Sequence, residues 1–164
     1  HFCLRAGPVS YVPWDELVER LKEDAPNQVW KLKDASTITE TLPPVRGYRM
    51  RYTLRHAHQA RPGASGTGAQ RQIELDRFVR LPIKEGLCEP LGLALSDSSE
   101  FRAIVSSLEP NRTTVTVWVY PDSFDDFRKL KAELFQRGYA TAGRPLPEGH
   151  PIGGSPDGSR SASQ

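Results

Sequence analysis

The segment from Thr113 to Pro147 places the strongest constraint on the fold, because it combines a strand, a helix and a second strand. Valines alternate with threonines and aromatic residues at its start, which is the pattern of a largely buried strand. Asp122 or Ser123 is expected to cap the helix, and Gly138 stands where a left-handed C-terminal residue is needed. Crossovers of this kind are almost always right-handed, so we expect two parallel neighbouring strands in one sheet.

The expected helix carries its apolar residues at helical spacing, and we place them on one buried face. They are Phe124, Phe127, Leu130, Leu134 and Phe135. The second strand is expected to begin near Tyr139.

The sequence of residues 1–26 predicts a short hairpin that leads into a helix. Apolar positions recur at helical spacing after Pro13, and Pro26 is expected to end this helix. The apolar residues from Val29 to Leu32 indicate a brief strand.

Two further elements follow from periodicity. Regular alternation over residues 48–82 predicts an antiparallel β-hairpin, in which Arg77 breaks the alternation and indicates a bulge. A capping-box pattern at Asp97–Glu100 predicts a helix over residues 98–108.

These elements predict an α+β fold with a mixed sheet, in which about three helices pack on the sheet. We expect residues 1–147 to form a single domain. Residues 148–164 are rich in Gly, Ser and Pro, so we expect a mobile tail.

The composition limits which classes of partner and which cellular compartment are expected. The 164 residues include 22 basic and 20 acidic ones, so the net charge of +2 does not by itself indicate a nucleic-acid or membrane partner. No apolar run approaches the roughly 20 residues that span a bilayer, so we expect this segment to be soluble. Because the chain begins with His1 and enters a strand at once, we expect it to be a fragment of a longer protein. Cys3 and Cys88 fit two buried thiols, with a single disulfide as the alternative.

The first candidate binding surface is a stripe of basic residues on one strand face, formed by Arg49, Arg51 and Arg55. Such a stripe can bind a polyanion, which makes a nucleic-acid-binding module one hypothesis. The alternative is a solvated face, because Glu74 and Asp76 on the neighbouring strand can pair with these arginines.

The second candidate site is the turn Pro121–Ser123, since ligands of open α/β sheets bind where a parallel strand ends. Asp122, Asp125 and Asp126 at this helix start can stabilise the helix. They can also be the carboxylates of a hydrolase or phosphoryl-transfer enzyme, with Arg144 steering an anionic substrate.

Metal and cofactor signals are weak. His56 and His58 are separated by one residue, and no third ligand lies nearby in the sequence. The glycine-rich run Gly63–Gly68 lacks the lysine of a phosphate-binding loop and is interpreted as a flexible hairpin loop. We therefore expect no metal and no cofactor.

The C-terminal half resembles an uncharacterised bacterial family. The resemblance rests on the run FRAIVSSLEPNRTTVTVWVYPDSF and its continuation, from Phe101 to Gln164, and more loosely on FCLRAGPVSYVP, from Phe2 to Pro13. It implies a larger protein with an upstream membrane helix and a domain on the outer side of the bacterial inner membrane. The βαβ layout is also broadly similar to periplasmic domains of biopolymer-transport proteins, which is an analogy of fold alone.

The function that we expect is a non-catalytic binding or scaffold domain of a membrane-tethered cell-envelope protein, whose partner is a protein or cell-wall material. No nucleic-acid partner is expected. The enzyme centred on Asp122 is the alternative, and nucleic-acid binding through the arginine stripe is a third hypothesis.

Overall fold

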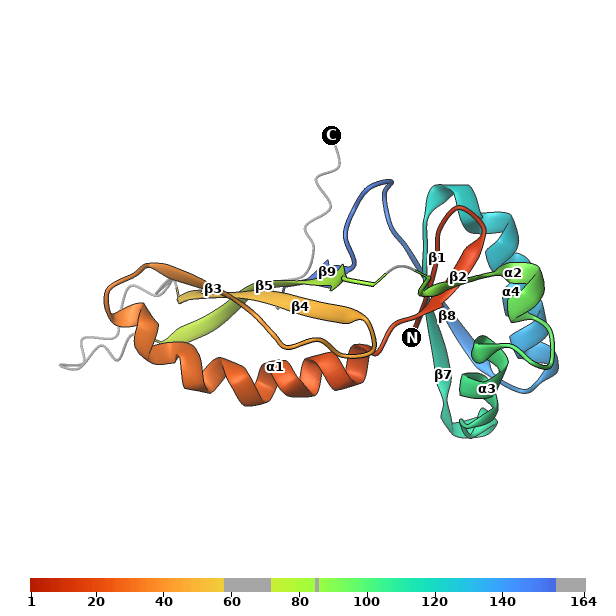
Figure 1. Cartoon of the computed structure of the whole chain (residues 1–164), viewed down its shortest axis with the longest axis horizontal. Coiled ribbons are helices and arrows are strands. Elements are labelled where there is room, and N and C mark those ends of the chain that lie inside the picture. Colours follow the sequence, from red (N-terminus) through yellow and green to blue (C-terminus); the bar gives the residue numbers. More distant parts are fainter. Residues whose placement is uncertain (58–71, 85, 156–164) are drawn as a thin grey trace, which may run out of the picture. The chain divides into compact units, whose positions relative to one another are not determined.

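The protein is an α+β structure with two β-sheets (Figure 1). The computed structural model describes residues 1–57, 72–84 and 86–155. The fold class predicted from the sequence is confirmed.

The chain forms two compact units. The first unit comprises residues 1–14 and 84–152, and the second comprises residues 15–83 and the chain from Gly153 onward. One domain over residues 1–147 stays a prediction, since compact units can fold together or separately.

A five-stranded mixed sheet forms the centre of the first unit. Its strands, in spatial order, are β6 (Cys88–Pro90), β2 (Pro8–Tyr11), β1 (Phe2–Leu4), β7 (Thr114–Val119) and β8 (Ala140–Pro145). β1 is antiparallel to β2 and parallel to β7, so the predicted N-terminal hairpin is confirmed.

The chain passes from β7 to β8 through the 3-10 helix η3 (Pro121–Ser123) and the helix α4 (Phe124–Gln136). The two strands are parallel neighbours, with Thr114 opposite Ala140. The predicted βαβ unit is therefore confirmed.

The end of α4 is a Schellman motif. The N–H of Tyr139 donates to the carbonyl of Leu134 at 2.9 Å, and the N–H of Gly138 donates to the carbonyl of Phe135 at 2.9 Å. Gly138 has φ of 82°, a left-handed conformation that glycine adopts without strain.

Both faces of β7 are buried in its C-terminal half. Val115, Val117 and Val119 belong to a core that also contains side chains of the helices, such as Leu130 of α4. Trp118 and Tyr120 point to the other face, where they pack with a smaller apolar cluster. The residues of that cluster are Cys3, Val12 and Ile152, with Trp14 and Leu146 packed against it.

Two shorter α-helices complete the first unit. α3 (Glu100–Ser106) corresponds to the helix predicted over 98–108, but its N-cap is Ser99, whose hydroxyl accepts a hydrogen bond from the N–H of Arg102. The helix α2 (Leu91–Ala94) was not predicted, because one turn is too short to show helical periodicity. The short 3-10 helix η2 spans Pro110–Arg112.

The prediction of one buried apolar face on α4 is only partly right. Leu130 and Leu134 are fully buried and Phe127 packs against the core, whereas Phe124 is 42% and Phe135 78% exposed. Successive residues of an α-helix are rotated by about 100°, so Phe124 and Phe135, which are eleven positions apart, lie on the same side of α4. This side is rotated by roughly 100° from Leu134. The two phenylalanines therefore face away from the sheet.

The second unit contains a four-stranded antiparallel sheet and one long helix. In spatial order the strands are β3 (Thr37–Thr41), β4 (Tyr48–His56), β5 (Ile73–Pro82) and β9 (Gly153–Gly154). The helix α1 (Trp14–Gln28) runs along β3, β4 and β5 in Figure 1. Tyr52 of β4 is fully buried, and its hydroxyl donates to Asp24 Oδ2 of α1 at 2.5 Å, so α1 covers this face of the sheet.

The predicted hairpin over residues 48–82 is confirmed by the pairing of β4 with β5. Thr53 lies opposite Arg77, and Leu54 lies opposite Leu75, so Asp76 is the extra residue of a bulge. The break in alternation predicted at Arg77 is thus observed.

Two local predictions in the second unit are wrong, and one strand was missed. Pro26 lies inside α1 and does not end it, and the side chain of Asn27 donates to the carbonyl of Glu23 at 3.0 Å in this last turn. The segment predicted as a strand at Val29–Leu32 belongs to the 3-10 helix η1 (Val29–Lys33). β3 was missed, because threonines on its exposed face leave little apolar alternation.

The start of the predicted tail is part of the fold. Ile152 is 1% exposed, and Gly153 pairs with Val79 of β5. A Cβ atom at Gly153 would lie 2.4 Å from the carbonyl oxygen of Phe78, so only glycine fits there. Residues 156–164 of the predicted tail lie outside the described residues.

We expect Gly138→Ala to lower the free energy of unfolding by about 1–2 kcal/mol, because a Cβ atom is disfavoured in the left-handed conformation. Urea titration followed by far-UV circular dichroism measures this change. The control is Gly92→Ala in α2, where no atom lies within 4 Å of the added Cβ, and where alanine should stabilise by about 0.5–1 kcal/mol. Equal effects of the two substitutions would contradict the role assigned to Gly138.

Candidate functional site

The turn at the start of α4 is bonded to the protein's own β1–β2 turn. The hydroxyl of Ser123 donates to Asp122 Oδ1 at 2.7 Å, and Ser123 is fully buried. The backbone N–H of Gly7 lies 3.5 Å from the Ser123 hydroxyl, which accepts its hydrogen bond. The hydrogen bond from Ser123, followed by that from the backbone of Ala6, lowers the pKa of Asp122. These hydrogen bonds occupy the Ser123 hydroxyl and the Asp122 carboxylate, which are the polar side chains that a ligand at this turn would need.

The other two carboxylates of the predicted catalytic set each pair with a cation one turn along the helix. Asp125 Oδ1 lies 2.6 Å from Nη1 of Arg128, and Asp126 Oδ1 lies 2.9 Å from Nζ of Lys129. The side chain of Asp125 is 86% exposed. An acid–base pair needs neighbouring carboxyl groups with separated pKa values in a concave site. The arrangement instead matches helix stabilisation by charge pairs and the helix dipole.

Arg144 lies on the face of the sheet that α4 does not cover. It stands opposite Trp118 in the register between β7 and β8, so its side chain points to the same face as Trp118. Val117 and Val119 point to the other face, which packs against α4. Arg144 is therefore not brought together with Asp125 and Asp126.

The second unit exposes one face of β4, which we call the open face. Met50, Tyr52 and Leu54 are buried on the α1 side, whereas Arg49 and Arg51 are exposed on the opposite side. Neither arginine forms an ion pair with any residue in the part of the chain that the structure describes.

Arg55, the third member of the predicted stripe, is neutralised. Its Nε lies 2.7 Å from Glu74 Oε1, and its Nη1 lies 3.0 Å from Asp76 Oδ1. Arg77 also approaches Asp76 at 3.7 Å. The stripe is thus divided into an ion-paired end near the bulge and a positively charged end at Arg49 and Arg51.

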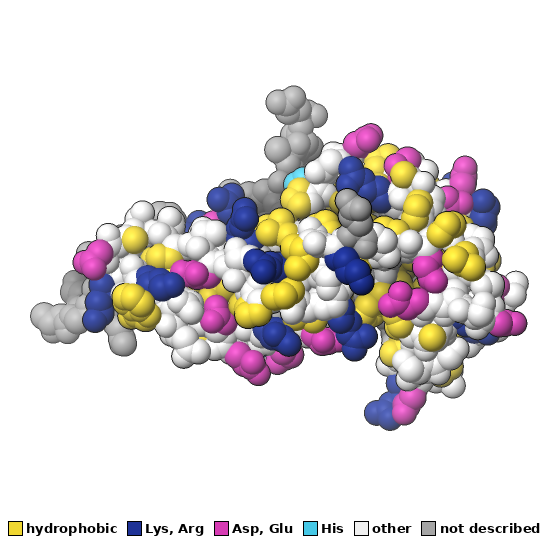
Figure 2. All heavy atoms as spheres, in the orientation of Figure 1, with side chains coloured by type: hydrophobic (Ala, Val, Ile, Leu, Met, Phe, Trp, Pro, Cys, Tyr) yellow, Lys and Arg dark blue, Asp and Glu magenta, His cyan; other side chains and the backbone are white. Residues whose placement is uncertain are grey.

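The residues next to Arg49 and Arg51 on the open face are hydroxyl-bearing or aliphatic. Arg51 lies between Thr41 of β3 and Val79 of β5, and Arg49 lies opposite Leu81. Across the side of the molecule drawn in Figure 2, basic and acidic side chains are interspersed.

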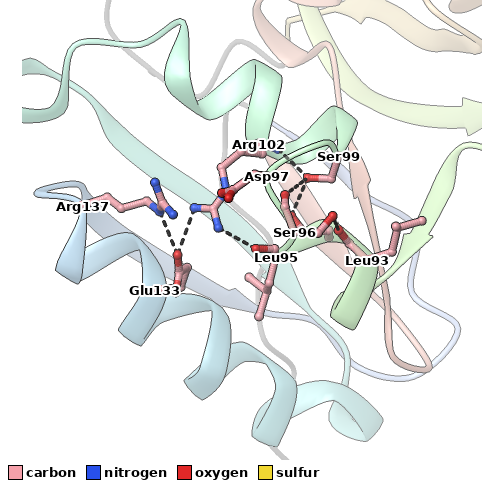
Figure 3. Close-up of polar contacts among 9 residues, drawn as sticks. Leu93, Leu95, Ser96, Asp97, Ser99, Arg102, Glu133 and Arg137 are labelled. Atoms are coloured by element: carbon pink, nitrogen blue, oxygen red, sulfur yellow. Dashed lines mark hydrogen bonds and ion pairs between the residues drawn. The ribbon is translucent and has the colours of Figure 1, made fainter.

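Sequence reasoning missed a buried charged cluster that joins α3 to α4 (Figure 3). The side chain of Arg102 is 8% exposed, and its Nη1 donates to Glu133 Oε1 at 2.9 Å. Its Nη2 donates to the carbonyl of Leu95 at 2.5 Å. Arg137 donates to the same Glu133 oxygen at 2.7 Å from a more exposed position. An arginine within the periodic pattern of α3 was the available signal, but its partner on α4 is distant in sequence.

Metal, thiol and membrane features add no further site. No group of three or more His, Cys, Asp or Glu side chains could hold a metal ion within residues 1–57, 72–84 and 86–155. His58 and the run Gly63–Gly68 lie outside the described residues. Cys3 is buried and Cys88 is exposed, so the prediction of two buried thiols is wrong for Cys88. No described helix has the length and apolar character needed to cross a bilayer.

Comparisons of the chain with protein-family models, curated proteins and solved structures find no match. The resemblance of residues 101–164 to a bacterial envelope family therefore stays a prediction.

We expect Arg102→Ala to lower the free energy of unfolding by about 2–4 kcal/mol, because it leaves Glu133 and the Leu95 carbonyl without a buried partner. Urea denaturation measures the change. Arg137→Ala removes a more exposed donor to the same carboxylate and should cost less than about 1 kcal/mol. Similar losses in the two variants would show that burial does not decide the strength of this cluster.

The contribution of Glu133 should depend on pH. Hydrogen bonds from Arg137 and then from Arg102 lower its pKa from the ordinary value of 4.5. A carboxyl group with a lower pKa in the folded state stabilises fully above its unfolded pKa, and this stabilisation is lost as the pH falls through the folded pKa. The difference in unfolding free energy between the wild type and Glu133→Gln should therefore shrink from about pH 6 to about pH 3.

The control for this pH series is Glu109→Gln, which removes a carboxylate from an exposed pair with Arg112. Its difference from the wild type should stay small throughout. A difference for Glu133→Gln that grows on acidification would contradict the assigned direction.

Proposed function

We propose that this chain is a non-catalytic binding or scaffold domain of a membrane-tethered bacterial cell-envelope protein, and that its open face binds an anionic segment of a protein or of cell-wall material. The observation that carries the binding role is the exposure of Arg49 and Arg51 without ion pairs among the described residues. The envelope location rests on the resemblance of residues 101–164 alone.

The geometry of the open face suits an extended anionic segment. Arg49 and Arg51 are two positions apart on one strand, so their Cα atoms are spaced by about 7 Å. Alternate residues of an extended peptide have the same spacing. Guanidinium groups bind carboxylates or phosphates through paired hydrogen bonds, and the hydroxyl of Thr41 beside Arg51 adds a further polar contact.

The enzyme hypothesis is less well supported by the site. Asp122 bonds to the protein's own turn, and Asp125 and Asp126 are neutralised by neighbouring cations. The nucleic-acid hypothesis requires a continuous basic stripe, and the pairing of Arg55 interrupts it.

We expect the double variant Arg49→Ala/Arg51→Ala to bind a fluorescent peptide of alternating Glu and Ser about tenfold more weakly than the wild type, because two charge-assisted contacts are lost. Fluorescence anisotropy measures the affinity, which should fall as the salt concentration rises. Co-sedimentation with purified peptidoglycan sacculi tests the cell-wall alternative with the same variant.

The matched control is Arg112→Ala/Arg128→Ala, which removes two exposed arginines of the first unit and should leave binding unchanged. A peptide of alternating Gln and Ser reports the part of the affinity that does not depend on charge. Equal binding by the wild type and the open-face variant in both assays would refute the proposed surface. Tighter binding to single-stranded DNA than to the acidic peptide would favour the nucleic-acid hypothesis. The envelope location is tested by fusing alkaline phosphatase to the protein encoded by the longest natural reading frame. An inactive phosphatase in this fusion would count against the envelope location.

A further inference from the structure

The second unit contains an open groove beside η1, separate from the residues that define the open face. Its volume is 370 Å³, which falls within the roughly 300–1,000 Å³ of small-molecule sites. His56 and Ile73, which pair across β4 and β5, form one side. The lining residues are Val29, Trp30, Leu32, Lys33, His56 and Ile73.

The groove offers an aromatic surface at its edge. Trp30 is 64% exposed, although tryptophan is among the residues with the largest gain from burial. Leu32, which also lines the groove, is 1% exposed. Lys31 Nζ lies 5.9 Å from the centroid of the Trp30 ring, and the exposed remainder of the indole is suited to stacking with a planar group.

The charge of the lining is positive. Lys33 is exposed and has no ion pair with a residue that the structure describes, whereas Lys31 is paired with Glu40 at 2.6 Å. Among the residues that the structure describes, no acidic residue lines the groove, and Asp34, which follows Lys33 in the chain, is not part of the lining.

His56 supplies an unused polar group beside the groove. Its Nε2 lies 3.0 Å from the carbonyl oxygen of Leu32, so Nε2 carries the proton of that hydrogen bond. Its Nδ1 is buried and has no hydrogen-bond partner among the described residues. Because Nε2 carries the proton, Nδ1 is a lone-pair acceptor, so a ligand contact with it needs a donor group and not the anionic group.

We infer that this groove binds a small aromatic anion, with the aromatic ring stacked on Trp30 and the acidic group directed to Lys33. The apolar wall accounts for the aromatic part of the ligand, and the unpaired cation accounts for the anionic part. This site is independent of the open face and of the function proposed for it.

The probe for this site is anilinonaphthalene sulfonate, an aromatic anion whose fluorescence rises in apolar surroundings, titrated into the whole chain. Trp30→Ala should weaken its binding about tenfold, because the stacking surface is removed. Lys33→Glu should weaken it about fivefold through charge reversal. The uncharged dye phenylnaphthylamine should respond to Trp30→Ala and stay unaffected by Lys33→Glu.

The controls are Phe135→Ala and Lys131→Glu on α4, which change an exposed aromatic residue and an exposed lysine of the first unit. Both should bind the sulfonate dye as the wild type does, and so should Arg49→Ala/Arg51→Ala, which separates this test from that of the open face. Unchanged binding by Trp30→Ala, or equal weakening by Phe135→Ala, would overturn the inference. Equal responses of the two dyes to Lys33→Glu would overturn the assigned anion preference. Far-UV circular dichroism of each variant excludes dye binding that follows from unfolding.

Discussion

The fold of the first unit depends on the burial of β7 from both sides. A strand with solvent on one face can alternate apolar and polar residues, but β7 has valines on one face and Trp118 on the other, with Tyr120 just past its end, and all of these side chains are buried. The helices must therefore cover one face, and the chain from Leu146 to Ile152 contributes to the cover of the other. The hydroxyl of Tyr120 donates to the carbonyl of His150 at 2.5 Å, which ties that cover to the sheet. Parallel strands have such cover because the crossover connections place helices and other chain segments on the faces of the sheet. The apolar side chains on both faces are then shielded from water.

Several charged groups of the first unit hold its own elements together. Asp122 and Ser123 bond to the β1–β2 turn, and Glu89 of β6 accepts the backbone N–H groups of Glu100 and Phe101 at 3.0 Å each, at the start of α3. Arg102 of α3 donates a hydrogen bond to Glu133 of α4 and so joins these two helices. Polar groups that already have short internal partners gain little from a ligand, since binding would exchange one hydrogen bond for another. The unpaired guanidinium groups and the exposed indole of the second unit therefore carry the two binding proposals.

The local pattern of apolar residues in the sequence predicted those helices and strands whose buried positions follow the same periodicity. In β4, alternate residues from Tyr48 to Tyr52 are buried and exposed as their sequence pattern indicates, and β7–α4–β8 follows from its valines, its helix and Gly138. Prediction failed where periodicity is short or where tertiary contacts override it, as in α2, η1 and β3. The exposed positions of Phe124 and Phe135 were missed because helical spacing shows which residues share a stripe, but does not show which stripe meets the sheet. The candidate site was predicted residue by residue, and the sequence offered pairing with Glu74 and Asp76 as the alternative, but it did not show which of the arginines pair or that a groove lies beside Trp30.

By itself, the amino-acid sequence determined the α+β class, the parallel crossover and the hairpin of β4 and β5, because each rests on interactions between residues near one another in the chain. Only the tertiary structure decided that the strands form two sheets, that Gly153 joins β5, and that Arg49 and Arg51 stay unpaired among the described residues while Arg55 does not. The physical reason is that strand partners, ion pairs and grooves are set by distances between segments far apart in sequence. Those distances follow from how the elements pack, and no local pattern of residue types contains them.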